Sequence, residues 1–252
     1  MNVISSTRTF LLILIALGLF AVNAQACDKT INIGTNERYW PPYVVLKNEH
    51  LTGLEINIIK TIFKDSPFCI NFTLLPNSLR ALEELKHGRI DLMFSASKTR
   101  ERQAYAHFSL PYREEVMLLY QHTDSATISS LEQLFKKGLT AGVNRGSFLG
   151  HTFKTLSDKY NKQIVLTSDA DKRFALLNKK RVDFVVDDSL VAHHFANKYT
   201  AILPVEQVAP VNVNNVHFMM SKKTITLDEV NIINAHIVKN KAALKALVKD
   251  VI

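Results

Sequence analysis

A short run of hydroxyl and cationic residues follows a buried-looking strand at a spacing that suits anion binding. Ser95 and Ser97 lie two residues apart directly after the apolar run RIDLMF, so in an extended segment their side chains point the same way. Thr99 is a suitable helix N-cap, which places Arg102 in the first turn of a helix, where the helix macrodipole disfavours a cation. An arginine at this position requires a compensating anion.

A carboxylate would satisfy these groups together. It can pair with Arg102 in a bidentate manner and accept hydrogen bonds from the two serine hydroxyls and from N–H groups at the helix start. Charge-assisted bonds contribute about 1.5 to 3 kcal/mol each, so two or three of them supply much of the roughly 8 kcal/mol of a micromolar site. The residues alone leave a second interpretation open, in which Arg102 pairs with Glu101 or Glu115 and the serines only end a strand.

The elements that must position this cluster alternate between strand-like and helix-like segments, which predicts an α/β fold with a mainly parallel sheet. We expect strands near 30–35, 69–74, 89–94, 114–120, 139–143, 163–167 and 182–186, and helices near 53–64, 78–87, 100–106, 148–158, 170–179 and 189–198. The predicted helix over 78–87 has Asn77 as its N-cap and Gly88 at its end.

Two segments of similar sequence indicate where a ligand would bind. LKHGRIDLMFSAS, which begins at Leu85, resembles LNKKRVDFVVDDS, which begins at Leu177. Ligands of open parallel sheets bind beyond the carboxyl ends of the strands, so the serine and arginine cluster would face Asp187 and Asp188 across a cleft that suits a zwitterion. Adjacent strand residues point in opposite directions, so only one of the two aspartates can face the cleft and they do not form a catalytic dyad.

The N-terminus has the pattern of a signal peptide over residues 1–26. Arg8 precedes an apolar run from Phe10 to Val22, and Ala24 and Ala26 satisfy the A-x-A cleavage rule. We therefore expect export to the periplasm. Without the leader's single basic residue, 30 basic and 23 acidic residues remain; export and the scattering of the lysines argue against a nucleic-acid partner.

The two cysteines begin neighbouring strand-like segments. If those strands are parallel neighbours, Cys27 and Cys69 start close together, and an oxidising compartment favours a disulfide between them. Lipidation of Cys27 stays open as an alternative. No H-E-x-x-H, C-x-x-C, G-x-S-x-G or phosphate-loop pattern occurs, so neither a metal nor a cofactor is expected.

Five segments resemble the bacterial extracellular solute-binding proteins of the polar amino acid class. They are IGTNERYWPPY, LTGLEINIIKTIF, LKHGRIDLMFSASKTRERQAYAHFSLPY, LTAGVNRGSF and RVDFVVDDSLVAHHF. The resemblance implies a two-lobed periplasmic binding protein fold of type II with a two-strand hinge near REEVMLLY and NVHFMMS. Lobe 1 would comprise residues 27–117 together with 217–252, and lobe 2 residues 118–216.

The resemblance also implies roles for individual residues. Arg102 would grip the α-carboxylate of the ligand, Ser95 and Ser97 would donate hydrogen bonds, and Asp188 would take the α-ammonium. Gly146 and Ser147 would offer backbone N–H groups from lobe 2, although Phe148 replaces a common hydroxyl residue and Arg100 replaces a usual proline.

Three further residues have both a binding and a structural interpretation. Trp40 lies where the family has an aromatic residue lining the pocket, or else it covers the core of lobe 1. Asn36 could touch the side chain of the ligand or make a turn. Arg80 could reach the cleft mouth and favour an acidic or amide side chain, or it is simply solvated.

We therefore expect a monomeric, non-enzymatic solute-binding protein that passes a small amino acid or related carboxylate to an inner-membrane ABC permease. Two alternatives stay open. One is a periplasmic enzyme similar to cyclohexadienyl dehydratase, with Glu55 or Asp188 as the acid. The other is a ligand-binding sensory protein.

Overall fold

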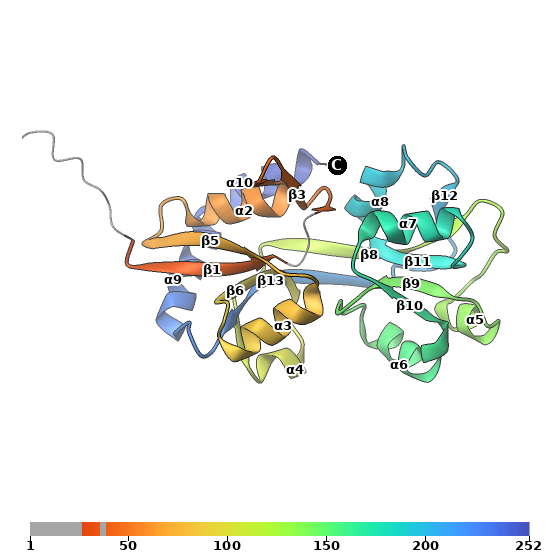
Figure 1. The fold of residues 1–252 in the computed structure, drawn as a ribbon, viewed down its shortest axis with the longest axis horizontal. Coiled ribbons are helices and arrows are strands. Elements are labelled where there is room, and N and C mark those ends of the chain that lie inside the picture. Colours follow the sequence, from red (N-terminus) through yellow and green to blue (C-terminus); the bar gives the residue numbers. More distant parts are fainter. Residues whose placement is uncertain (1–26, 36–38, 252) are drawn as a thin grey trace, which may run out of the picture.

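The computed structural model describes residues 27–35 and 39–251, so the predicted signal peptide and Asn36 lie outside the described residues. The described chain forms two lobes (Figure 1). Two long antiparallel strands run between them, β8 (Arg113–His122) and β13 (Asn212–Ser221). The predicted lobe boundaries after residues 117 and 216 fall inside these two strands, which remain our proposed hinge.

A single mixed sheet continues through both lobes in the order β10-β9-β11-β8-β13-β6-β1-β5. Its other strands are β1 (Lys29–Thr35), β5 (Phe68–Leu74), β6 (Leu92–Ser97), β7 (Ala106–Phe108), β9 (Ala141–Asn144), β10 (Ile164–Thr167), β11 (Phe184–Asp188) and β12 (Ile202–Pro204). β1 is parallel to β5 and β6, and β9 is parallel to β10 and β11. The predicted α/β class is confirmed.

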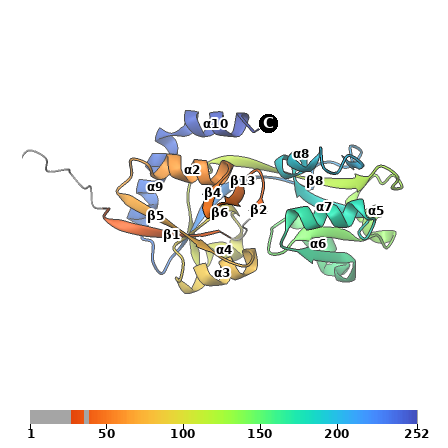
Figure 2. The ribbon, with the colours of Figure 1, turned by 45° about the horizontal axis from the view of Figure 1, so that its top comes forward.

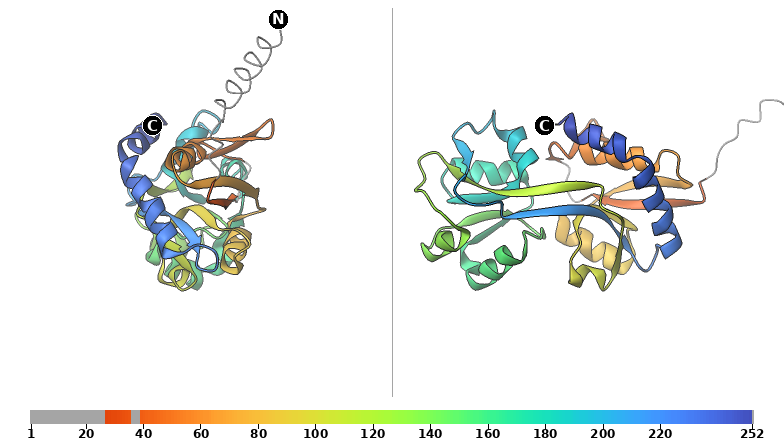
Figure 3. Two further views of the ribbon diagram at one scale, coloured as in Figure 1. Left: turned by 90° about the vertical axis from the view of Figure 1, so that its left-hand side faces the viewer. Right: turned by 180° about the vertical axis from the view of Figure 1, so that it is seen from behind.

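Helices cover the sheet in each lobe (Figure 2). They are α2 (Leu54–Phe63), α3 (Ser78–His87), α4 (Arg100–Gln103), α9 (Leu227–Lys239) and α10 (Lys241–Lys249) in the first lobe, and α5 (Leu131–Lys136), α6 (His151–Lys159), η1 (Asn161–Gln163), α7 (Ala170–Asn178) and α8 (Ser189–Phe195) in the second. The C-terminal helices α9 and α10 return to the first lobe and pack against α2 (Figure 3). The first lobe is therefore discontinuous in sequence.

Helix α3 shows how local sequence sets the ends of an element. The Asn77 side chain accepts a hydrogen bond from the N–H of Arg80, and Gly88 ends the helix in the left-handed conformation, with φ of 74°. Between these caps the helix buries Ala81 and Leu85 against the sheet. Both predicted caps are confirmed.

Several predicted boundaries are wrong because long-range strand pairing overrides local pattern. The predicted helix over 100–106 ends at Gln103, since Ala106 pairs with Ser221 in β13. The strand predicted over 89–94 runs instead from Leu92 to Ser97, because its last residue pairs with Val216. A small sheet of β2 (Tyr39–Trp40), β3 (Val44–Lys47) and β4 (His50–Thr52) was not predicted.

Cys27 and Cys69 form a disulfide. Strands β1 and β5 are parallel neighbours, with Thr30 opposite Cys69, which brings their starting ends together as predicted. Across the described residues, no helix has both the length and the apolar character needed to span a membrane.

Candidate functional site

A cavity of about 60 Å³ lies where the two lobes meet. This volume has room for roughly four water molecules or for a comparably compact polar group. Its polar walls are Ser78, Ser95, Ser97 and Arg102 from the first lobe, Glu115 from β8, and Asn144, Ser147, Arg173 and Asp187 from the second lobe. Charges of both signs therefore surround a small space.

Arg102 bridges the lobes at this cavity. The Thr99 side chain caps α4 by accepting the Arg102 N–H, as predicted. The guanidinium donates from Nη1 to the carbonyl of Ser97 and from Nη2 to the carbonyl of Gly146, both at 3.1 Å. No carboxylate of the described residues forms an ion pair with it, so the alternative pairings with Glu101 and Glu115 do not occur. Burial lowers the Arg102 pKa, which reflects a cation without a counterion.

The two serines also line the cavity, but their hydroxyls already have partners. Ser95 Oγ donates to Glu55 Oε1 at 2.6 Å and accepts from Arg113 Nη2 at 2.9 Å. The backbone of Ser95 has φ of 51°, a left-handed conformation that is uncommon for serine. Ser97 Oγ accepts from the Asn214 amide at 3.0 Å. The Ser95 hydroxyl, which was predicted to donate to the ligand, therefore belongs instead to a buried hydrogen-bond network.

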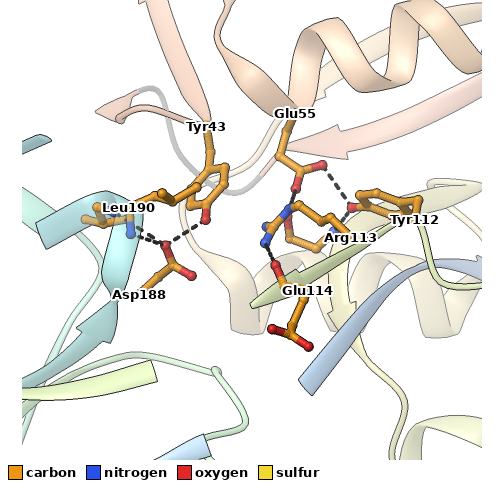
Figure 4. A network of polar contacts seen from close by, with 9 residues as sticks. Tyr43, Glu55, Tyr112, Arg113, Glu114, Asp188 and Leu190 are labelled. Carbon is orange, nitrogen blue, oxygen red and sulfur yellow. Dashed lines mark hydrogen bonds and ion pairs between the residues drawn. The ribbon is translucent and has the colours of Figure 1, made fainter. Parts of the chain in front are cut away.

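That network is centred on an ion pair between Glu55 and Arg113 (Figure 4). Arg113 Nε donates to Glu55 Oε1 at 2.6 Å, and the Tyr112 hydroxyl donates to Glu55 Oε2 at 2.9 Å. The Arg113 guanidinium also lies over the Tyr43 ring, 4.4 Å from its centroid. Sequence reasoning did not identify Arg113 or Tyr43.

Asp188 contacts the first lobe without lining the cavity. Its Oδ1 accepts from the Tyr43 hydroxyl at 2.6 Å and from the N–H of Leu190 at 2.8 Å, so it also caps α8. Asp187 lines the cavity instead, and Arg173 Nη2 donates to it at 2.7 Å. Strand alternation thus separates the two carboxylates as expected, but it turns Asp187, rather than Asp188, to the cavity.

Glu115 is a cavity residue that sequence reasoning treated only as a possible partner of Arg102. Its side chain is buried, and it forms no hydrogen bond or ion pair with any described residue. Burial raises the pKa of its carboxyl to about 8, against the lowering effect of Arg113, and Asp188 and Glu55 raise it further. The alternation of buried and exposed residues along β8 places Arg113 and Glu115 on the buried face and Glu114 outside. Glu115 could have been identified from the sequence because it is a charged residue at a position where strand alternation predicts burial.

The other predicted site residues divide into two groups. Trp40 lines the cavity, with its ring 4.5 Å from that of Tyr43. Gly146 and Ser147 line it too, although Gly146 contributes its carbonyl to Arg102. Arg80 is exposed, pairs with Glu84 at 2.6 Å, and is not a cavity residue. No cluster of metal-ligating side chains occurs in 27–35 or 39–251.

Comparisons with known proteins agree with this architecture. Residues 31–252 match the family described as bacterial extracellular solute-binding proteins, family 3. No curated protein sequence matches the chain.

Three solved structures illustrate the fold. An ancestral arginine-binding protein bound to arginine is 23% identical, with a TM-score of 0.75, over 88% of this chain and 97% of that chain. The substrate-binding protein of an amino acid ABC transporter is 21% identical, with a TM-score of 0.73, over 88% and 98%. A histidine kinase sensor domain similar to periplasmic binding proteins is 20% identical, with a TM-score of 0.75, over 88% and 95%. The predicted two-lobed binding protein fold is confirmed.

Proposed function

Because the chain belongs to family 3 of the bacterial extracellular solute-binding proteins, we propose that it captures a small amino-acid-like zwitterion or carboxylate between its lobes. The protein acts in the periplasm and delivers this ligand to an inner-membrane ABC permease. Two of the similar structures are described as an arginine-binding protein bound to arginine and as the substrate-binding protein of an amino acid ABC transporter. Those descriptions support the ligand class and leave the individual ligand open.

The observation that carries the proposal is the unpaired guanidinium of Arg102. A cation that is partly removed from water costs free energy unless an anion neutralises it, and the half-buried Arg102 donates only to two backbone carbonyls within the described residues. A ligand carboxylate in the cavity would supply the missing charge through bidentate hydrogen bonds. Closure about β8 and β13 would then enclose the ligand between the lobes.

A second, larger cavity offers space for a ligand side chain. It measures about 470 Å³ and shares Arg102, Gly146 and Phe148 with the smaller cavity. Tyr105 and Phe153 add aromatic surface to it. A ligand with its charged head at Arg102 would therefore extend its side chain toward these rings.

A thermal-shift screen of the twenty common L-amino acids and of small carboxylates tests this function. A ligand at 100 times its Kd stabilises the native state by about 2.7 kcal/mol. We expect Arg102→Ala to abolish the shift while the protein stays folded. Lys98→Ala is the matched control, because Lys98 is an exposed cation four residues before Arg102 and lines neither of the two cavities. Binding that survives in Arg102→Ala would refute the proposed site.

An enzyme on the same fold is a second candidate, favoured by one observation. Acid-catalysed loss of a hydroxyl group needs a carboxyl that stays protonated near neutral pH, and the Glu115 pKa of about 8 meets that need. Glu55 and Asp188, the acids expected from sequence, do not line the cavity. Incubation with prephenate or arogenate, followed by mass spectrometry, distinguishes the two functions: a binding protein returns the compound unchanged.

A further inference from the structure

Glu115 differs from every other carboxylate near the interlobe cavity of the described chain. Glu55 accepts hydrogen bonds from Ser95, Arg113 and Tyr112. The two strand aspartates are also engaged, one by Arg173 and the other by Tyr43 and the start of α8. Glu115 has no such donor, although its residue is only 5% exposed and lines the cavity.

Glu115 and Arg102 are groups of opposite type that line the same cavity, and neither has a partner of opposite charge among the described residues. Both side chains line the same cavity, Arg102 as a cation without a counterion and Glu115 as a carboxyl without a donor. Asp187, the other carboxylate of that cavity, is already neutralised by Arg173. A ligand that carries one positive and one negative group would satisfy both unpaired residues.

We propose that Glu115 receives the ammonium group of the ligand and is the residue by which the site selects amino acids over the corresponding 2-hydroxy acids. This inference rests on the proposed function and assigns the ammonium to a different residue from Asp188, the position that the family resemblance implies. An ammonium donates to Glu115 and carries the opposite charge, whereas a hydroxyl at the same place offers only a neutral hydrogen bond.

The charges around Glu115 predict that binding of an ammonium releases a proton. Arg113 on the same strand lowers the pKa of Glu115, whereas Glu55 from α2 and Asp187 and Asp188 from β11 raise it, and burial raises it most. Arg102 on α4 and the Tyr43 hydroxyl also interact with this carboxyl. The net pKa is about 8, so the empty site holds the acid mostly protonated at neutral pH.

The arriving ammonium stabilises the ionised carboxylate, and the displaced proton passes to the buffer. From a pKa of about 8, the ionised fraction of Glu115 rises about 50-fold between pH 6 and pH 8, and the affinity for an amino acid should rise with it. The affinity for a 2-hydroxy acid should change little, because a hydroxyl does not require the ionised form.

The test uses isothermal titration calorimetry on the wild type, Glu115→Gln and Glu114→Gln. The probes are the twenty common L-amino acids and, for each that binds, the 2-hydroxy acid with the same side chain, such as lactate for alanine or phenyllactate for phenylalanine. Glu114→Gln is the matched control, because Glu114 is the neighbouring carboxylate on β8 and is exposed.

We expect the wild type to prefer the amino acid, and Glu115→Gln to weaken amino acid binding about 10- to 150-fold at pH 8, with little effect on the hydroxy acid. Titrations at pH 7 in phosphate and in Tris should show that the wild type releases about 0.9 proton on binding an amino acid. Glu115→Gln should release none, and Glu114→Gln should behave like the wild type.

The titrations distinguish an ammonium bound at another residue from a protein that binds no amino acid. If an amino acid binds but Asp188→Asn, rather than Glu115→Gln, removes the preference and the proton release, the ammonium lies at Asp188 and the inference is wrong. If the wild type binds its amino acid and hydroxy acid equally, the inference is wrong as well. A wild type that binds none of the twenty amino acids refutes the amino acid function and the inference together.

Discussion

The hydroxyl of Tyr43 donates a 2.6 Å hydrogen bond to Oδ1 of Asp188, and this bond joins the two lobes (Figure 4). Both residues are at most 1% exposed. The same tyrosine ring lies against Arg113, so the contact links the second lobe to the buried ion pair of the first. Contacts between the side chains of the two lobes therefore stabilise the closed arrangement in part, without any contribution from a ligand.

Removal of this hydroxyl should shift the ligand-free protein toward an open form. Tyr43→Phe keeps the ring but leaves Asp188 without its interlobe donor, and a hydrogen bond to a charged group contributes about 1.5 to 3 kcal/mol. The closed population should therefore fall at least tenfold relative to the open one, which small-angle X-ray scattering would record as a larger radius of gyration. Tyr39→Phe is the control, because Tyr39 contacts Phe195 through its ring. Identical scattering of Tyr43→Phe and wild type would contradict the prediction.

The ion pair of Glu55 and Arg113 should matter for stability far more than a surface pair. Both side chains are at most 1% exposed, and removing one member leaves the other as a buried unpaired charge. Arg113→Met should lower the free energy of unfolding by about 3 to 5 kcal/mol in urea titrations. Arg89→Met, which removes an exposed arginine from Glu84, should have little effect. If both substitutions lowered the free energy of unfolding equally, burial of the ion pair of Glu55 would not determine its contribution to stability.

Alanine substitutions at two glycines distinguish an effect on lobe closure from an effect of backbone strain. Gly146 and Gly138 have positive φ, 85° and 74°, so alanine strains the backbone at either position. A Cβ at Gly146 would lie 3.1 Å from the backbone nitrogen of Leu79 in the opposite lobe, whereas one at Gly138 meets nothing within 4 Å. Gly146→Ala should therefore weaken ligand binding in calorimetry, while Gly138→Ala should lower only thermal stability. Similar binding by both variants would mean that this interlobe contact tolerates a methyl group.

The stability of the ligand-free protein should depend on pH through Glu115. Its pKa is raised from 4.5 to about 8 in the folded state, so the folded chain binds this proton more tightly than the unfolded chain. The contribution of this residue is fully present below pH 4.5 and is lost as pH rises to about 8, at about 1.4 kcal/mol per pH unit.

Glu115→Gln removes this dependence. Urea titrations at pH 5 and pH 8 should show that the variant gains stability relative to wild type by a few kcal/mol at the higher pH. Glu114→Gln provides the comparison, because its carboxylate is exposed on the same strand. If the variant and wild type differ by the same amount at both values of pH, Glu115 does not titrate in this range.

Features that depend on neighbours in the chain were predictable from sequence. Thr99 caps α4 at Arg102 because a hydroxyl can reach an N–H three residues ahead, and the same rule places Asn77 before α3. The pairing of Cys27 with Cys69 followed once two strand-like segments were taken as parallel neighbours. Each of these predictions needed only local geometry and one assumption about the sheet.

The faces of the sheet to which strand residues point could be predicted only in part. Alternation showed that Asp187 and Asp188 point in opposite directions, but which of them faces the cavity depends on how β11 lies against β8. The sequence by itself thus determined the fold class and the family, and it indicated the disulfide and the cation Arg102 on α4. Tertiary structure alone decided the charge pattern of the site, because Arg113 engages Glu55 from 58 residues away and leaves Glu115 without a partner. Local pattern carries no information on contacts between such distant segments. They arise because a side chain from α2 reaches β8 and because β11 pairs with β8.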